Sequence, residues 1–201
     1  MVAGSGDPGR PGDAEVARWW TGQLLVASPS LTDPNFARAV VLVLDHDDDG
    51  ALGVVLDRPS ELAVADVLPT WTDVVDQPAQ LFAGGPVSTG SALGVAVLVP
   101  GTSAAPLGWR RVFGDTGLLD LDTPMEVLTD ALASLRIFAG YSGWSPGQLE
   151  AEVAEGAWFV VPTEPGDLVT ASPELLWGEV LRRQGGRLAL LATFPADPMQ
   201  N

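Results

Sequence analysis

The sequence contains no cysteine and no lysine, and it has a single histidine, His46. Without cysteine the chain has no disulfide, no thiol nucleophile and no cysteine-based zinc or iron–sulfur site. Without lysine it cannot form a Schiff base or build a phosphate loop of the Walker type, whose lysine contacts the phosphates. One histidine excludes a metal site built from several histidines, and any histidine base must be His46. We therefore expect no metal and no cofactor.

Long hydrophobic runs are also missing. The longest uninterrupted one covers residues 39–44, whereas a membrane-spanning helix needs about 20 apolar residues. The start of the chain lacks the basic and apolar regions of a signal peptide. We therefore expect a cytoplasmic protein with no membrane segment.

Positive charge is scarce. All ten basic residues are arginines, whereas 26 residues are acidic, so the net charge is −16. Such a chain repels a phosphate backbone at long range, and nucleic-acid binding usually requires a basic face. The only group of basic residues that could form part of such a face is Arg182, Arg183 and Arg187. Direct nucleic-acid binding is therefore not expected, and a regulator that contacts DNA remains a disfavoured alternative.

The composition is that of a folded domain. Hydrophobic residues make up 46% of the 201 residues, which is enough to offset the entropy of ordering one domain. Half of residues 1–18 are Gly, Pro, Asp or Ser, so we predict a disordered N-terminal tail there. The predicted domain covers residues 19–195, and residues 196–201 form a C-terminal tail.

Apolar runs separated by Gly and Pro predict strands at 23–27, 39–44, 52–56, 80–83, 93–99, 111–113, 117–121, 137–141, 158–161 and 187–193. The run at 39–44 is continuous, which is typical of a strand buried on both faces. The pairs Thr123-Pro124, Ser145-Pro146 and Ser172-Pro173 predict helix starts. These helices would end near Leu135, Glu155 and Arg183, and Glu126 and Gln148 can complete capping boxes. A shorter helix is predicted over 62–68. This pattern predicts one α+β domain with a mixed sheet.

Residues 45–50 read Asp-His-Asp-Asp-Asp-Gly and resemble the start of an EF-hand loop. An EF-hand needs a bidentate Glu at its twelfth position, and here that position is Leu56. The flanking segments are predicted strands rather than helices. We therefore interpret 45–50 as a polar hairpin turn, with weak cation binding as the alternative.

Two further segments are unusual. Residues 82–87 place Gly84 and Gly85 directly after a predicted strand, where glycine lets the backbone approach another group closely. Residues 140–150 carry Tyr141 and Trp144 between a strand and a helix start. Ser142 does not fit a hydrolase nucleophile elbow, because Trp144 stands where the second glycine should be.

Taken together, these segments resemble the YqgE/AlgH family of bacterial proteins. The resemblance covers residues 20–191 and rests on His46, Trp158 and the segments 23–27, 33–38, 50–59, 82–87 and 140–150. It implies an α+β fold with a split, barrel-like mixed sheet and about three to four packed helices. It implies no established activity, although one branch of the family has been called a transcriptional regulator. The chain departs from the family at Asp57, where Asn is usual, and in residues 192–201, which lack the usual Gly-x-Ala ending.

We interpret the protein as a non-enzymatic regulatory or binding module for a small anionic ligand or a protein partner. Polar residues at strand ends are where open sheets gather ligands, and Arg38 and Arg58 would supply bidentate donors for an anion. The candidate ligand-binding residues are Asp33, Asn35, Phe36, Arg38, Asp57, Arg58, Gly84, Gly85, Tyr141, Trp144 and Gln148. An alternative is that Asp33, Arg38, Asp57 and Arg58 only fix the strand ends. A second alternative is a hydrolase or transferase that uses His46 as its acid/base.

Overall fold

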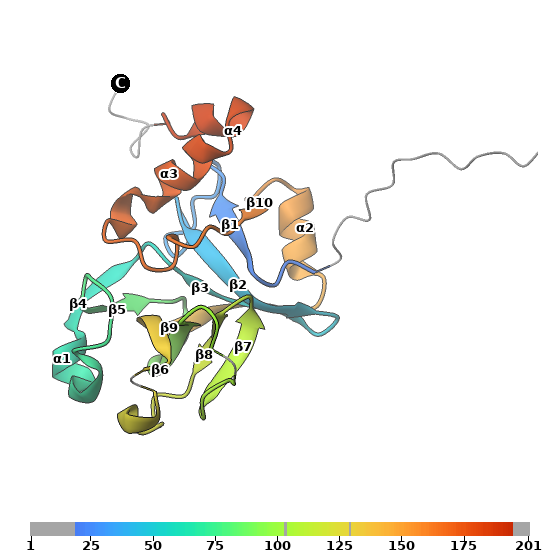
Figure 1. Ribbon diagram of the computed structural model, residues 1–201. Coiled ribbons are helices and arrows are strands. Elements are labelled where there is room, and N and C mark those ends of the chain that lie inside the picture. Colours follow the sequence, from blue (N-terminus) through green and yellow to red (C-terminus); the bar gives the residue numbers. More distant parts are fainter. Residues whose placement is uncertain (1–18, 103, 129, 195–201) are drawn as a thin grey trace, which may run out of the picture.

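Ten strands of the described chain join into one curled sheet, drawn in Figure 1. The computed structural model describes residues 19–102, 104–128 and 130–194, and both predicted tails, 1–18 and 196–201, lie outside the described residues. The strands are β1 (Gln23–Ala27), β2 (Val40–Asp47), β3 (Gly50–Val55), β4 (Pro59–Ala63), β5 (Gln80–Ala83), β6 (Val87–Leu98), β7 (Trp109–Phe113), β8 (Thr116–Leu119), β9 (Leu132–Trp144) and β10 (Trp158–Pro162).

Four α-helices accompany the sheet in the described residues: α1 (Val64–Val67), α2 (Gln148–Ala154), α3 (Leu176–Arg183) and α4 (Gly186–Leu191). Short 3₁₀ turns lie at Pro69–Trp71, Met125–Val127 and Pro173–Leu175. In Figure 1, α3 and α4 lie together beyond β1, while α1 lies beside β4 and β5. No helix among the described residues is long and apolar enough to cross a membrane.

The strand order is β10-β1-β2-β3-β9-β6-β8-β7, and every neighbouring pair in this path is antiparallel. β5 adds the one parallel pair, with β9, and carries β4 on its other side. The sheet curls into a half-barrel, so the predicted α+β class with a mixed, barrel-like sheet is confirmed.

β2 is buried on both faces, as the continuous apolar run predicted. Val40, Leu42 and Leu44 pack in one core cluster with residues of α3. Val41 and Val43 point the other way and pack in a second cluster that includes Leu149 of α2. Successive side chains of a strand alternate between its two faces. Because a hydrophobic cluster lies on each face, every position from Val40 to Leu44 has to be apolar. The hairpin with β3 also forms, and its turn lies at residues 48–49.

β9 joins the two parts of the sheet. Its first part pairs with β6, and its end pairs with β3. Between them Gly140 has φ +70°, and a Cβ there would clash with the carbonyl oxygens of Val87 and Gly85. A glycine is required here because the strand changes partner where two other backbones approach it.

Two predicted elements are wrong. The helix predicted from Thr123 is only the 3₁₀ turn Met125–Val127, because Pro124 is extended (ψ 131°) and the next residues enter β9 to pair with β6. The strand predicted at 187–193 is instead α4. Gly185 and Gly186 adopt positive φ and turn the chain back after α3, so that Leu188 and Leu191 pack on the core at helical spacing.

Candidate functional site

A cleft of about 870 Å³ opens between the β1–β2 connection, the start of β10 and α4. It is lined by Ser28, Pro29, Ser30, Leu31, Thr32, Ala37, Arg38, Gly156, Phe159, Arg187, Leu188, Leu191 and Phe194. Its volume lies within the range of small-molecule sites, roughly 300–1,000 Å³. The cleft is therefore large enough for an organic ligand.

The charge of this lining is opposite to that of the chain. Two of the ten arginines, Arg38 and Arg187, line the cleft, and none of the described lining residues is an Asp or Glu. The hydroxyls of Ser28 and Ser30 lie 2.7 Å apart in the same lining. A second cavity, of about 370 Å³, is different: its lining includes Asp115 and Glu164 and no arginine. The larger cleft is thus a local basic site with hydroxyl donors on an acidic protein.

Arg38 is held in a fixed position at the cleft. Its backbone has φ +59°, which is rare for a residue with a side chain. Its guanidinium lies 4.0 Å from the ring centroid of Trp177 and donates to the carbonyl oxygen of Phe194 at 2.9 Å. The Trp177 indole in turn donates to the Ala27 carbonyl oxygen at 2.9 Å. Partial burial lowers the pKa of Arg38.

Asp57 and Arg58 hold the backbone on both sides of Arg38. The Val40 N–H donates to Asp57 Oδ1 at 3.1 Å, and Arg58 donates to the Ala37 carbonyl oxygen at 2.5 Å. Arg58 also donates to Asp57 Oδ2 at 3.2 Å. Neither Asp57 nor Arg58 lines the cleft. They contact the segment that presents Arg38 to it.

Asp57 is almost fully buried, with 4% of its side chain exposed. Burial raises the pKa of Asp57 to about 6, and the charge of Arg58 and the backbone hydrogen bonds oppose this rise. The carboxyl is therefore ionised at neutral pH and becomes protonated under mildly acidic conditions.

Phe36 and Trp144 lie in an aromatic cluster with Trp158, next to α2. Gln148 is the first residue of that helix. The Phe36 ring stacks on Trp144 with centroids 6.2 Å apart and meets the edge of Trp158 at 5.6 Å. Both indoles donate to one carboxylate oxygen of Glu152, at 3.0 Å from Trp144 and 2.8 Å from Trp158. Gln148 donates to the other oxygen at 2.9 Å. These contacts dock α2 against the sheet.

Gln148 also forms half of the predicted capping box. Its side-chain oxygen accepts a hydrogen bond from the Ser145 N–H at 3.0 Å. Gly147, with φ +74°, is the residue before the first turn of α2. The predicted helix is therefore present, but it begins at Gln148 with Gly147 as its N-cap, and Ser145 is not the N-cap that the sequence pattern predicted.

The remaining candidates lie elsewhere. Gly84 and Gly85 pack against the backbone of β9, where the Ser142 hydroxyl donates to the Gly84 carbonyl oxygen at 3.2 Å. Tyr141 is half-buried on β9 opposite Val87. Asp33 is exposed and accepts a hydrogen bond from the Asn35 N–H at 2.8 Å within a turn. Of the eleven candidate ligand-binding residues, the structure places only Arg38 in the 870 Å³ cleft.

His46 is buried between two tryptophans, with ring centroids 5.2 Å from Trp19 and 5.1 Å from Trp20. Its Nδ1 accepts a hydrogen bond from the Trp20 N–H at 3.1 Å, which leaves the proton of the neutral ring on Nε2. Nε2 lies 3.2 Å from Glu150 and donates to it. Both ring nitrogens are thus engaged, and His46 lines neither described cavity.

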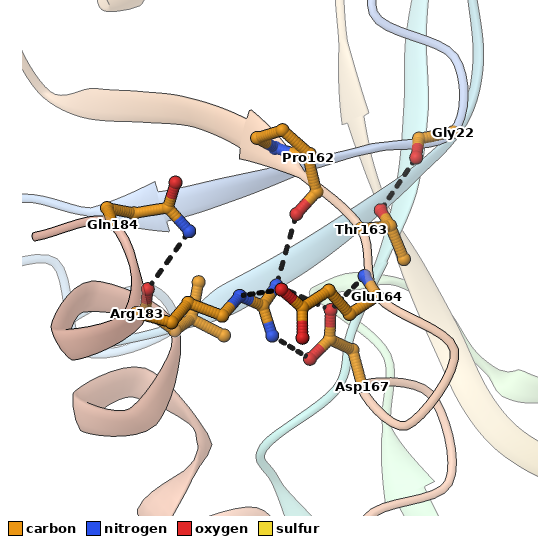
Figure 2. Close-up of polar contacts among 8 residues, drawn as sticks. Gly22, Pro162, Thr163, Glu164, Asp167, Arg183 and Gln184 are labelled. Carbon is orange, nitrogen blue, oxygen red and sulfur yellow. Dashed lines mark hydrogen bonds and ion pairs between the residues drawn. The ribbon is translucent and has the colours of Figure 1, made fainter.

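Arg183 is turned inward rather than displayed on a basic face. Figure 2 shows it reaching from α3 to Asp167, with two hydrogen bonds of 2.5 and 2.7 Å, and to the Pro162 carbonyl oxygen at 3.1 Å. Asp167 also accepts from the Glu164 N–H at 2.6 Å. The hydrogen bonds to Asp167 raise the pKa of Arg183. This bidentate pair fixes α3 to the loop after β10.

Several residues of the cleft are not among those predicted from the sequence. Arg187, Leu188 and Leu191 lie in the segment 187–193 that was predicted as a strand, and Ser28 and Ser30 are not among the predicted site residues. The spacing of Leu188 and Leu191, three residues apart after a Gly-Gly pair, was the available signal for a helix. Glu152 was also missed, although it lies four residues after Gln148 and so on the same helix face.

The fold and the site together define a single-domain α+β protein with a half-barrel sheet and a basic cleft beside its β1 and β10 strands. Residues 24–189 match a family model described as AlgH-like. The chain belongs to this family, the YqgE/AlgH family, and the resemblance inferred from its motifs is confirmed.

Three relatives align with 90% or more of this chain. A UPF0301 protein from Streptomyces avermitilis is 62% identical over 183 residues, covering 90% of this chain and 95% of its own. A UPF0301 protein from Thermobifida fusca is 52% identical over 190 residues, with the same 90% and 95% coverage. A UPF0301 protein from Mycobacterium tuberculosis is 44% identical over 202 residues, covering both chains completely. None of these names states an activity.

Two solved structures have the same fold. The crystal structure of a protein from Corynebacterium diphtheriae has a TM-score of 0.81 at 37% identity, covering 86% of this chain and 91% of that one. The solution structure of the AlgH protein from Pseudomonas aeruginosa has a TM-score of 0.65 at 28% identity, covering 91% and 98%.

Proposed function

We propose that the protein is a non-enzymatic binding module that takes up a small organic anion in the cleft between the β1–β2 connection and α4. One observation carries this proposal. In a chain with a net charge of −16, the described lining of this cleft contains two arginines and no carboxylate. A basic concave site in an acidic protein attracts anions locally and repels them elsewhere.

The arrangement of the donors supports the proposal. Arg38 is held by its stacking on Trp177 and by the hydrogen bonds of Asp57 and Arg58 to its flanking backbone. A donor that is already ordered loses less entropy on binding. Arg187 is exposed on α4, and no described residue forms an ion pair with it. It is therefore available to an anion.

Isothermal titration calorimetry with a panel of organic carboxylates and phosphates tests the proposal. We expect saturable one-to-one binding, weakened at least about tenfold in Arg187→Ala, because a hydrogen-bonded charge contributes about 1.5–3 kcal/mol. Arg110→Ala removes an exposed arginine from β7, outside the cleft, and is the matched control. Absence of binding across the panel, or an equal loss in both variants, would refute the proposal.

A further inference from the structure

Most of the cleft lining other than the two arginines is apolar. Leu31, Phe159, Leu188, Leu191 and Phe194 all line it. α4 contributes two of these residues, yet none of its residues is fully buried. Phe194, just after α4, is 52% exposed. Covering apolar side chains that remain open to water in a cleft lowers the free energy of the complex.

From this combination we infer that the anion is an amphiphile, with an anionic head group at Arg38 and Arg187 and an apolar tail against α4 and Phe159. The inference rests on the proposed function and names its ligand class. A bare inorganic anion would leave most of the 870 Å³ unfilled and the apolar lining uncovered. A purely apolar ligand would leave the positive charges of Arg38 and Arg187 without an anionic partner. Only a molecule with both parts complements both surfaces.

The two arginines require only that the head group is negatively charged, and both a carboxylate and a phosphate ester meet this requirement. Both are recognised by arginine through charge-assisted hydrogen bonds. The tail is defined by the apolar lining it covers. Each methylene removed from water contributes about 0.8 kcal/mol, or about fourfold in affinity, when its burial is complete.

The test is calorimetry on the full chain, below the micelle concentration of each probe. The probes are acetate, octanoate, laurate, dodecyl phosphate and dodecyltrimethylammonium. We expect laurate to bind at least about tenfold more tightly than octanoate, because four additional methylenes leave water. The cationic dodecyltrimethylammonium should bind at least about tenfold more weakly than laurate, because its head group is repelled by both arginines. Laurate and dodecyl phosphate in parallel identify which head group is preferred.

Two leucines of α4 provide a matched pair of variants. Leu191 lines the cleft, whereas Leu190 is 68% exposed and lies outside the lining. Leu191→Asn should weaken laurate at least about fivefold with little effect on acetate. Leu190→Asn, which makes the same chemical change on the same helix, should leave both affinities unchanged. Arg187→Ala should weaken laurate and acetate alike.

Each contrary result has a distinct meaning. If acetate binds as tightly as laurate and both depend on Arg187, the proposed function stands and the amphiphile is refuted. If no anion binds, both fail. If laurate and dodecyltrimethylammonium bind with equal affinity, the cleft recognises the apolar tail but not the charge of the head group. This result also refutes the inference.

Two other occupants of the cleft are distinguishable. Sedimentation velocity that shows a dimer, dissociated by Leu191→Asn, would assign the cleft to a second copy of the chain. Laurate binding by a variant that ends at Phe194, with none by the full chain, would assign it to residues 195–201. Either result overturns the amphiphile.

Discussion

Asp57 combines a buried carboxylate with a contact to the segment that presents Arg38. Burial raises its pKa to about 6 from an ordinary 3.8. An acid whose pKa is raised on folding binds its proton more tightly in the folded state than in the unfolded state. Its contribution to the free energy of unfolding therefore falls as pH rises from about 4 through about 6, and it is level above that range. The full difference is about 3 kcal/mol.

Asp57→Asn removes this titration and keeps an oxygen that accepts from the Val40 N–H. We expect the free energy of unfolding of the variant, relative to that of the parent, to rise by about 2–3 kcal/mol between pH 4 and pH 8. Urea denaturation at several pH values measures this difference. Asp45→Asn removes an exposed carboxylate from β2 and controls for the loss of one negative charge. A relative stability that stays level, or that falls with pH, would show that the burial of Asp57 is not the dominant effect.

At the scale of elements, α2 depends on one carboxylate. Glu152 accepts hydrogen bonds from the indoles of Trp144 and Trp158, both of which are buried. Glu152→Ala leaves two indole N–H groups without their acceptor, and each such loss costs about 1–3 kcal/mol. We expect the free energy of unfolding to fall by about 2–4 kcal/mol, measured by urea denaturation.

Two variants make this result specific. Glu152→Gln keeps one oxygen for the indoles, so it should lose less than half as much stability as Glu152→Ala. Glu155→Ala removes an exposed carboxylate just after α2 and should change stability by less than about 0.5 kcal/mol. Equal effects of Glu152→Ala and Glu155→Ala would contradict a docking role for Glu152.

The elements that the sequence predicted well are those with local signals. β2 and its hairpin with β3 follow from a continuous apolar run and a polar turn. The existence of α2 was predicted from Ser145, Pro146 and Gln148, although the helix begins only at Gln148, with Gly147 as its N-cap. The first part of β9 was misread because Thr123-Pro124 carries a helix-start signal, while pairing with β6 decides its structure. α4 was misread because the apolar run at 187–193 is compatible with either element. Sheet pairing and core packing, rather than local pattern, decided both cases.

The residues of the candidate site also differ in whether a local sequence pattern indicates them. Arg38 was found because it lies in a recognisable polar motif, and Asp57 and Arg58 were found with it. Arg187 is 149 positions further along the chain, and α4 brings it to the same cleft. No local pattern indicates that proximity, because it arises from the packing of α3 on β1 and of α4 on α3. The sequence therefore predicted one arginine of the cleft together with its supports, but not the cleft itself.

At the scale of the whole molecule, few of the arginines in the described part of the chain are free to contact a large anionic partner. Arg136 is buried, lies 4.2 Å from the Phe82 ring centroid and donates to two backbone carbonyl oxygens. Burial lowers its pKa to about 10. Arg183 is engaged by Asp167, and Arg58 by Asp57. The predicted basic group at the end of α3 is thus reduced to Arg182 and to Arg187, which lines the cleft.

This distribution predicts that the protein does not bind duplex DNA specifically. Affinity for DNA comes largely from counterions released by Lys and Arg contacts to phosphates. A chain with a net charge of −16, no lysine and few free arginines among residues 19–194 is expected to make few such contacts. Fluorescence anisotropy with labelled duplexes at about 150 mM salt should show no saturable binding below about 10 µM protein. Arg182→Ala is the informative variant, because Arg182 is exposed, whereas replacing Arg183 would also break its pair with Asp167. Submicromolar binding that weakens steeply with salt and is lost in Arg182→Ala would show that a local basic face outweighs the net charge. Any regulatory role would then act through DNA rather than through the anion cleft.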